Sequence, residues 1–151
     1  MKYDKFFDLA KAAGLEEVEL FISTSYSLSF SLFHSEVDAY SVEDGSSFVA
    51  RGVYKGKFGV AMSDVYNAEK AQFLVDSIIA NAGVIETEDP AILFKGSDKY
   101  KKINTYNPGL SKISVDEKMN KLYELEKRIK ELDPRIVEIE GVEYSESSSS
   151  I

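Results

Sequence analysis

From Glu17 to Ser63 the sequence repeatedly alternates apolar and polar residues with a period of two. The alternation is clearest where Leu28, Phe30 and Leu32 are separated by serines. Successive side chains of a β-strand point to opposite faces, so this pattern predicts strands with one buried face and one solvated face. The predicted strands are Val18–Ile22, Leu28–Leu32, Glu36–Val42, Phe48–Tyr54 and Phe58–Ser63.

Short turns are predicted between these strands. Asp44-Gly45 is a strong hairpin dipeptide, and Lys55-Gly56-Lys57 predicts a second reversal. Strands joined in this way are antiparallel, because a parallel return needs a crossover of about a dozen residues or more. We therefore expect a meander of about five strands within an α+β fold. The whole antiparallel sheet is predicted to have five to six strands, with about three helices mostly on one face.

Two segments flanking this region have helical spacing. Lys2–Ala13 predicts a short amphipathic helix that ends at Gly14, because glycine readily adopts the left-handed conformation found at helix ends. Asn67 is a good N-cap residue for a second helix, which we expect to end near Gly83. The residues expected to face inward are Tyr3, Phe6, Phe7 and Ala10 in the first helix, and Ala71, Leu74, Val75, Ile78 and Ala82 in the second.

A third helix is predicted in the C-terminal part of the chain. Ser114 and Glu117 have the spacing of a capping box, which marks a helix start. Asp133-Pro134 stops the helix, because proline disfavours a helical conformation in the residue before it. The inward-facing residues are expected to be Val115, Met119, Leu122, Tyr123 and Ile129.

The remaining segments are a long connection and a serine-rich tail. Glu86–Lys112 is polar and punctuated by proline and glycine, so we expect a surface connection within one domain that spans residues 1–151. Ile136–Tyr144 is typical of a strand. The serine run that follows is either a disordered terminus or, as Tyr144–Ile151, the start of a strand that continues further. The sequence leaves both interpretations open.

Few side chains can support metal binding. The 151 residues contain one histidine, His34, and no cysteine, which excludes thiol chemistry and a cysteine-rich zinc site. On a strand, His34, Glu36 and Asp38 would share a face and could contact a hard metal ion. We favour a turn between two strands in which the imidazole faces water. The chain is therefore predicted to have no catalytic, cofactor-binding or metal-binding residue.

Other motifs of catalysis and phosphate binding are missing. The sequence has no G-x-S-x-G elbow, and its glycines do not open a helix directly after a strand, as a dinucleotide or phosphate cradle requires. One basic cluster is present, for which we favour a solvated loop over a phosphate-binding patch. It consists of Lys95, Lys99, Lys101 and Lys102.

Charge and hydropathy limit the partners and the location. The net charge of −8 argues against binding nucleic acid directly or binding an anionic membrane. No apolar run approaches the roughly 18 residues that span a bilayer, and Met1–Gly14 does not look like an export signal. We therefore expect a soluble protein, and the lack of cysteine suits the reducing cytoplasm.

Several local phrases point to a known family. A helix ending in AAGLEEVELFIS leads into the alternating strands, and FVARGVYKGKFGVAMSDV is followed by a helix. This order resembles the N-terminal region of TldD/PmbA-family proteins, which are described as modulators of DNA gyrase. Phe48 and Ala50 depart from the pattern, since small residues or glycine are usual there. The matching positions are Gly56, Gly59, Ala61 and Ser63-Asp64, and later Asn107-Pro108, Ser114–Lys118 and Asp133–Ile136.

The resemblance implies a fragment rather than an enzyme. Family members are about three times as long as this chain, a size at which proteins divide into several domains. The zinc-binding H-E-x-x-x-H helix of TldD-type members lies beyond the similar region, and PmbA-type members, which Asp133–Ile136 slightly favours, lack it. No catalytic or ligand residue of the family transfers to a position here. Any zinc is expected in the full-length parent or its partner.

The resemblance also implies a role. The chain would be the non-catalytic N-terminal domain of a peptidase or peptidase partner that acts on unfolded peptides. It would help form the substrate chamber and the interface of a homo- or heterodimer with a TldD/PmbA-type chain. A second hypothesis is a stand-alone peptide- or protein-binding module with no link to proteolysis. A third, which we rank last, is a small enzyme that uses His34.

One strand is a candidate for peptide contact. The segment Ser27–Phe33 carries serines on one face, which leaves its backbone accessible, so an extended peptide could add to it if it is a sheet edge. The alternative is a central strand whose serines simply face water.

Overall fold

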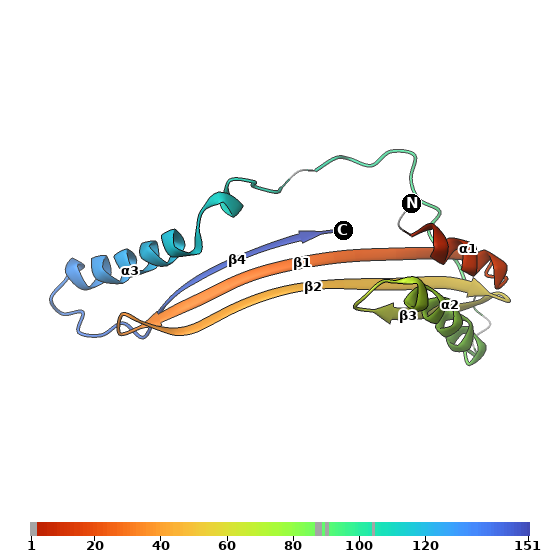
Figure 1. Ribbon diagram of the computed structural model, residues 1–151, viewed down its shortest axis with the longest axis horizontal. Helices are drawn as coiled ribbons and strands as arrows, with labels where there is room; N and C mark the ends of the chain where they lie inside the picture. The colour runs from red at the N-terminus through yellow and green to blue at the C-terminus, as the bar shows by residue number, and fades with distance from the viewer. Residues whose placement is uncertain (1–2, 87–88, 90, 104) are drawn as a thin grey trace. The chain divides into compact units, whose positions relative to one another are not determined.

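The alternating part of the sequence contains two strands that are much longer than predicted (Figure 1). The computed structural model describes residues 3–86, 89, 91–103 and 105–151, with β1 at Glu17–Phe33 and β2 at Glu36–Tyr54. Their 17 and 19 residues exceed the roughly 3–10 that are usual in globular proteins. β3 (Lys57–Ser63) and β4 (Val142–Ser150) complete a sheet in the order β3-β2-β1-β4.

The prediction of five to six strands is therefore wrong, although the α+β class is right. The sheet is antiparallel and has four strands. The predicted turn at Asp44-Gly45 does not form, and Gly45 lies inside β2. A reversal there would leave the middle of β1 without a partner, and the continuous strand avoids this loss. Two pairs of separately predicted strands each form one continuous strand. Val18–Ile22 and Leu28–Leu32 both belong to β1, and Glu36–Val42 and Phe48–Tyr54 both belong to β2.

Two tight turns reverse the chain, at His34-Ser35 and at Lys55-Gly56. The φ angles are +52° and +62° in the first turn and +51° and +72° in the second. Positive φ at both central residues is the requirement of a type I′ turn, whose twist matches that of the flanking strands. Glycine adopts this conformation freely, whereas a residue with a Cβ atom loses roughly 1–2 kcal/mol. The predicted place of His34 in a turn between strands is confirmed.

The described residues form two compact units that share the strands β1 and β2. Unit 1 consists of Met1–Thr24, Gly45–Tyr100 and Ser150–Ile151, and unit 2 of Ser25–Asp44 and Lys101–Ser149. In each unit, the apolar residues of β1 that pack against helices are even-numbered, as expected for one face of a strand.

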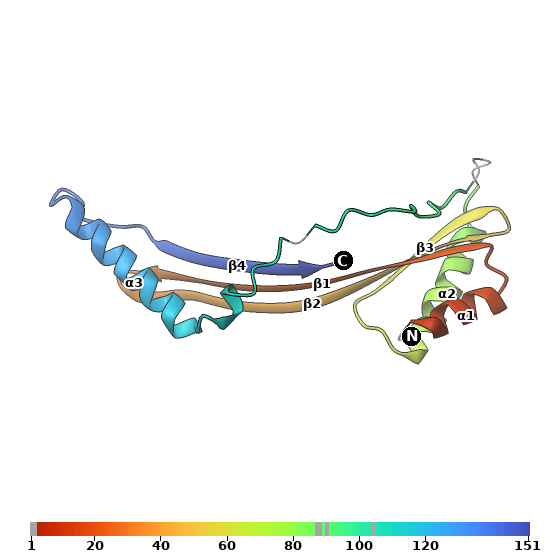
Figure 2. The same ribbon diagram turned by 90° about the horizontal axis from the view of Figure 1, so that it is seen from above.

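In unit 1, α1 (Asp4–Ala12) and α2 (Ala68–Gly83) pack on the sheet (Figure 2). Asn67 caps α2 as predicted, because its Oδ1 accepts a hydrogen bond of 2.8 Å from the Lys70 N–H. The predicted inward stripe of α2 is fully confirmed. The predicted start of α1 at Lys2 lies outside the described residues. The buried residues of α1 are Phe6 and Ala10, whereas the prediction that Phe7 faces inward is wrong, because its side chain is 42% exposed.

The end of α1 sets the direction in which β1 begins. Gly14 has φ +83°, and its N–H donates to the Lys11 carbonyl at 3.1 Å. The Leu15 N–H reaches back to the Ala10 carbonyl at 3.0 Å, and the Leu15 side chain is buried. These two bonds and the buried apolar residue form a Schellman motif, so the chain leaves the helix in one defined direction.

In unit 2, α3 (Val115–Leu132) covers Leu28, Phe30 and Leu32 of β1. Ser114 caps the helix by accepting from the Glu117 N–H at 3.2 Å, and the helix ends before Asp133-Pro134, both as predicted. Leu122 is buried at the centre of this contact. The other predicted inward residues of α3 are partly buried against the same cluster, namely Val115, Met119, Tyr123 and Ile129.

The two C-terminal predictions have different outcomes. The long connection is irregular in its described residues, apart from the short 3-10 helix η1 (Leu110–Lys112) and the buried side chain of Leu93. Its residues 87, 88, 90 and 104 lie outside the described part. The strand begins at Val142 rather than at Ile136, and the serine run belongs to it as β4.

Among the described residues, no helix combines the length and apolar character needed to cross a membrane.

Gly59 should be the position in unit 1 least tolerant of a side chain. A Cβ atom there would lie 2.1 Å from the Ile78 carbonyl oxygen of α2, a backbone atom that cannot easily move. We expect Gly59→Ala to lower the free energy of unfolding by about 1–3 kcal/mol or more. Gly83→Ala is the control, since nothing lies within 4 Å of its Cβ position. Urea unfolding followed by circular dichroism measures both, and equal midpoints would contradict the close packing of α2 on β3.

Candidate functional site

His34 and its acidic neighbours do not form a metal centre. The His34 Nε2 lies 3.4 Å from Glu138 Oε1, and both side chains are 59% exposed. Glu36 and Asp38 are exposed on β2. Within the described ranges, no three His, Asp or Glu side chains gather closely enough to hold a metal ion. The zinc that the resemblance associates with the family therefore does not fit the residues seen here.

The lysines of the connecting segment are exposed, as expected for a solvated loop. Lys95 has an 85% exposed side chain, and its Nζ lies 3.7 Å from Glu17 Oε1. Such an exposed pair contributes little, because water and salt screen it. Lys99, Lys101 and Lys102 are likewise exposed.

The strand that was a candidate for peptide contact is central. β1 lies between β2 and β4, so Ser27–Phe33 has no free edge and the edge hypothesis for this strand is wrong. The reason is that the serine-rich tail pairs as β4 along β1. The strands that end the sheet in the described part of the chain are β3 and β4.

The two neighbouring strands of unit 2 present serine on the face that points away from α3. The serines of β1 alternate with Leu28, Phe30 and Leu32, which α3 covers. Those of β4 alternate with Tyr144 and Glu146, whose side chains lie on the α3 side. We call this surface the serine face, and it consists of Ser25, Ser27, Ser29 and Ser31 of β1 with Ser145, Ser147 and Ser149 of β4.

A buried ion pair joins α3 to β4. The Lys118 Nζ lies 2.7 Å from Glu146 Oε1, and the two side chains are only 5% and 10% exposed. The Tyr144 hydroxyl donates to the second carboxylate oxygen, Oε2, at 2.5 Å. Both oxygens of Glu146 are therefore engaged, as a charge removed from water requires.

This environment shifts two pKa values. Burial, followed by the hydrogen bond to Glu146, raises the pKa of Tyr144 to about 12. For Glu146, burial is the largest influence and opposes ionisation, but the hydrogen bonds from Lys118 and Tyr144 outweigh it. The net effect is a pKa below the ordinary value of 4.5. At neutral pH the tyrosine is uncharged and the carboxylate is ionised.

A second buried carboxylate holds the turn between β1 and β2. The Ser35 N–H donates to Glu126 Oε1 at 3.1 Å, and the Lys130 Nζ donates to the same oxygen at 2.8 Å. The bond from Lys130, ahead of the one from Ser35, keeps the pKa of Glu126 below its usual value despite burial. Glu126 thus anchors a turn whose central residues, His34 and Ser35, both have positive φ. Its Oε2 is buried without a partner among the described residues.

Lys118 and Glu126 were not among the residues predicted to face inward, yet they are 4% and 2% exposed. The spacing of these two residues in the sequence did indicate their burial. Each lies four residues from Leu122, and side chains four apart share a helix face. The apolar stripe of α3 is therefore continued by one charged residue on either side of its buried leucine.

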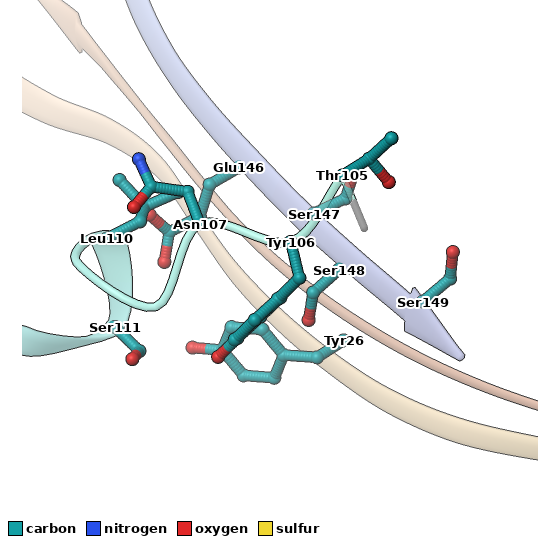
Figure 3. Close-up of a pocket in the computed structure, with 10 residues that line it drawn as sticks. All are labelled: Tyr26, Thr105, Tyr106, Asn107, Leu110, Ser111, Glu146, Ser147, Ser148 and Ser149. Atoms are coloured by element: carbon teal, nitrogen blue, oxygen red, sulfur yellow. The ribbon is translucent and has the colours of Figure 1, made fainter. Parts of the chain in front are cut away.

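A cavity of about 310 Å³ lies within unit 2, beside β4 (Figure 3). Residues from three parts of the chain border it: one from β1, five from the connecting segment up to η1, and four consecutive residues of β4. Hydroxyl groups predominate, and Glu146 is the charged residue of the set. The lining residues are Tyr26, Thr105, Tyr106, Asn107, Leu110, Ser111, Glu146, Ser147, Ser148 and Ser149.

The fold and these features define a class of protein. The described part of the chain is an α+β domain with hydroxyl-rich surfaces and a neutral cavity, and it has no cluster of metal ligands. Hydroxyls, tyrosine rings and backbone groups can bind a ligand through hydrogen bonds and stacking. These groups suit a binding or structural domain.

Comparisons with known proteins point to one family. Residues 18–82 match the model of the PmbA/TldA metallopeptidase domain 1. A candidate modulator of a DNA gyrase from Thermotoga maritima has the same fold over 97% of the chain, with a TM-score of 0.81 and 25% identity. No curated protein matches. Residues 18–82 thus match the first domain of the PmbA/TldD family, and the chain as a whole shares the fold of the Thermotoga protein.

Two further solved structures share the fold. TldE from Thermococcus kodakarensis matches 99% of the chain with a TM-score of 0.74 and 19% identity. A candidate modulator of DNA gyrase from Bacteroides thetaiotaomicron matches 97% with a TM-score of 0.70 and 17% identity. The chain spans 32% of the Thermotoga protein and 34% of each of the other two, about a third of their length.

Lys118 should contribute far more to stability than its exposed neighbours. Lys118→Met leaves the buried carboxylate of Glu146 without its counter-charge, which typically costs about 3–5 kcal/mol. Lys127→Met, at a side chain that is 76% exposed, is the control and should change stability by less than about 0.5 kcal/mol. Urea unfolding at neutral pH measures both variants.

The pH dependence of the free energy of unfolding tells whether Lys118 stabilises the fold through its charge or through packing. The folded-state pKa of Glu146 is lowered, so its stabilisation is present above the ordinary value of 4.5 and is lost as the pH falls through the folded-state value. The difference between wild type and Lys118→Met should therefore shrink in acid. A difference that stays constant down to the acid limit of folding would show that Lys118 acts through packing alone.

Proposed function

We propose that this chain acts as the non-catalytic first domain of a peptidase-type protein, where it borders the space that receives unfolded peptides and takes part in a dimer interface. The observation that carries the proposal is the match to the first domain of a metallopeptidase family, together with a shared fold that spans about a third of the solved relatives. The reacting groups, zinc included, would then belong to the rest of the parent protein or to its partner chain.

The serine face supports the peptide-facing part of this role. Its side chains are small and uncharged, so they can exchange hydrogen bonds with any peptide backbone without demanding particular side chains. They also offer little apolar area, so a substrate would not adhere strongly. A wall that must tolerate many unfolded sequences needs both properties.

Apolar side chains on unit 1 support the interface. Val60 and Met62 of β3 are 37% and 63% exposed, and they alternate with Gly59 and Ala61, which face α2 and the core. Phe21 of β1, 42% exposed, likewise alternates with the core-facing Leu20. Exposed apolar residues that gather on one face of a sheet commonly mark contacts between proteins. A second PmbA/TldD-type chain, identical or different, is the partner we propose.

Photo-crosslinking tests the contact with peptides. A photoreactive residue in place of Ser29, on the serine face, should become linked to a reduced and alkylated polypeptide that cannot fold. The same residue in place of Glu69, exposed on α2, is the control and should give little product. Equal yields at both positions, or equal yields with the folded form of the same polypeptide, would refute a peptide-facing role for this surface.

Sedimentation equilibrium tests the interface. If Met62 lies in a dimer contact, Met62→Asp should weaken self-association, or association with a PmbA/TldD-type partner chain, by tenfold or more, because a carboxylate would be buried there without a partner. Leu132→Asp, at a side chain that is 77% exposed at the end of α3, is the matched control. A monomer at all concentrations, with and without the partner chain, would sink the dimer proposal.

A further inference from the structure

The cavity in unit 2 has the size and the chemistry of a small-molecule site. It holds about 310 Å³, which is at the lower end of the roughly 300–1,000 Å³ of such sites. We propose that it binds a neutral carbohydrate of about one or two rings. The ligand is a small molecule, so this inference goes beyond the proposed contact with peptides and does not depend on it.

Hydroxyl groups dominate the wall of the cavity. Seven of the ten lining side chains carry one, and Leu110 is the aliphatic member of the set. A hydroxyl group both donates and accepts hydrogen bonds, so a ligand with hydroxyl groups of its own can match it in either direction. An apolar ligand would remove water from the same groups without replacing the lost hydrogen bonds. The lining therefore favours a ligand that carries many hydroxyl groups.

Two tyrosine rings offer surfaces on which a sugar ring can stack. Tyr26 comes from β1 and Tyr106 from the connecting segment, and both border the cavity (Figure 3). Tyr26 is 37% exposed and Tyr106 is 58% exposed, so each residue retains surface that a ligand can cover. A tyrosine combines an apolar ring with a polar tip. A sugar ring has the same division, because its faces carry C–H groups and its rim carries hydroxyl groups.

Glu146 supplies a strong acceptor without giving the cavity an unbalanced charge. Its Oε1 is paired with the Lys118 Nζ at 2.7 Å, and its Oε2 accepts from the Tyr144 hydroxyl. Each carboxylate oxygen has a further lone pair, so either can also accept from a sugar hydroxyl in a charge-assisted hydrogen bond.

The same arrangement disfavours charged ligands. Among the described residues that line the cavity, none is a lysine, an arginine or a histidine. A phosphate or carboxylate group of a ligand would lose its hydration without meeting an unpaired cation. An ammonium group would meet a carboxylate that Lys118 already neutralises. The site should therefore select an uncharged sugar over its phosphorylated form.

The connecting segment holds its part of the wall in place before a ligand binds. The Asn107 Oδ1 accepts from the Gly109 N–H at 2.9 Å, and the Ser111 hydroxyl donates to the Pro108 carbonyl at 3.1 Å. The first bond orients the side-chain amide of Asn107, whose NH2 group can donate two further hydrogen bonds. Polar groups that are already ordered lose little conformational entropy on binding, which favours affinity for a small ligand.

NMR titration of the isotope-labelled chain with maltose, cellobiose, lactose and trehalose tests the proposal. We expect at least one of these neutral disaccharides to bind saturably and to shift amide signals at the cavity, those of Tyr106 and Ser148 included. Cyclohexanol, which has a ring and a single hydroxyl group, should bind at least tenfold more weakly, and so should a phosphorylated form of the sugar that binds. The absence of saturable binding by all four sugars, or equal affinity for either comparison compound, would overturn the assignment.

Variants of the chain locate the binding. Ser148→Leu should place an apolar side chain in the cavity and weaken sugar binding at least tenfold. Ser41→Leu is the matched control, because Ser41 is exposed on β2 and does not line the cavity. Tyr106→Ala should also weaken binding, since it removes a stacking surface, whereas Tyr100→Ala elsewhere in the connecting segment should not.

Circular dichroism shows which variants fold, and the two cavity variants lie on different segments, so either one can decide the test. Unchanged affinity in a folded cavity variant would refute the site. Crosslinking of unfolded polypeptide from Ser29 should persist in Ser148→Leu, because Ser29 does not line the cavity. Loss of sugar binding with crosslinking retained supports a separate small-molecule site, and displacement of the sugar by the unfolded polypeptide would contradict it.

Discussion

Burial of the even-numbered residues of β1 is the constraint on which the other features depend. In unit 1, Val18 and Leu20 pack against the core formed with α1 and α2, and in unit 2, Leu28, Phe30 and Leu32 lie beneath α3. Because side chains alternate along a strand, a slip of one residue would move this entire set to the other face. The same alternation places the serines of β1 on the face away from α3, so the serine face is a geometrical consequence of the core.

Stacked aromatic rings and a buried ion pair then fix the elements around Phe30 of β1. Its ring stacks on Tyr144 of β4 with centroids 5.0 Å apart, and lies 6.3 Å from the ring of Tyr40 of β2. Next to this row of rings, the buried pair between Lys118 and Glu146 joins α3 to β4. Apolar packing alone would tolerate small shifts of the helix along the sheet. A buried ion pair does not, because any shift leaves a charge without its partner. The carboxylate that borders the cavity is thereby held in one position.

The sequence predicted the features that local chemistry decides. Four predicted features depend on only a few adjacent residues, and all four are confirmed. They are the helix caps at Asn67 and Ser114, the helix end at Gly14 and the turn at Lys55-Gly56. The strand count failed at Asp44-Gly45, where continuous pairing with β1 outweighed the turn preference of the dipeptide.

The candidate site could not be predicted in the same way. Its lining residues come from positions 26, 105–111 and 146–149, and only the pairing of β4 with β1 brings them together. The sequence predicted a strand at Ile136–Tyr144 but left open whether the serine run after it is disordered or part of a strand, and that run forms most of β4. The burial of Lys118 and Glu126 was not predicted, because charged residues rarely occupy a core. Their partners, Glu146 and the Ser35 N–H, lie 28 and 91 residues away.

The division between a serine face and a neutral cavity bears on how such a domain could handle unfolded peptides. The serine face carries hydroxyl groups without charge, and Glu146, the charged residue that lines the cavity, is paired with Lys118. The net charge of −8 adds a long-range field that disfavours acidic segments and weakens with salt over a Debye length of about 8–10 Å. Under the proposed function, a surface of this kind would meet many different unfolded chains without binding any of them strongly, and the cleavage step would fall to residues elsewhere in the parent protein or its partner.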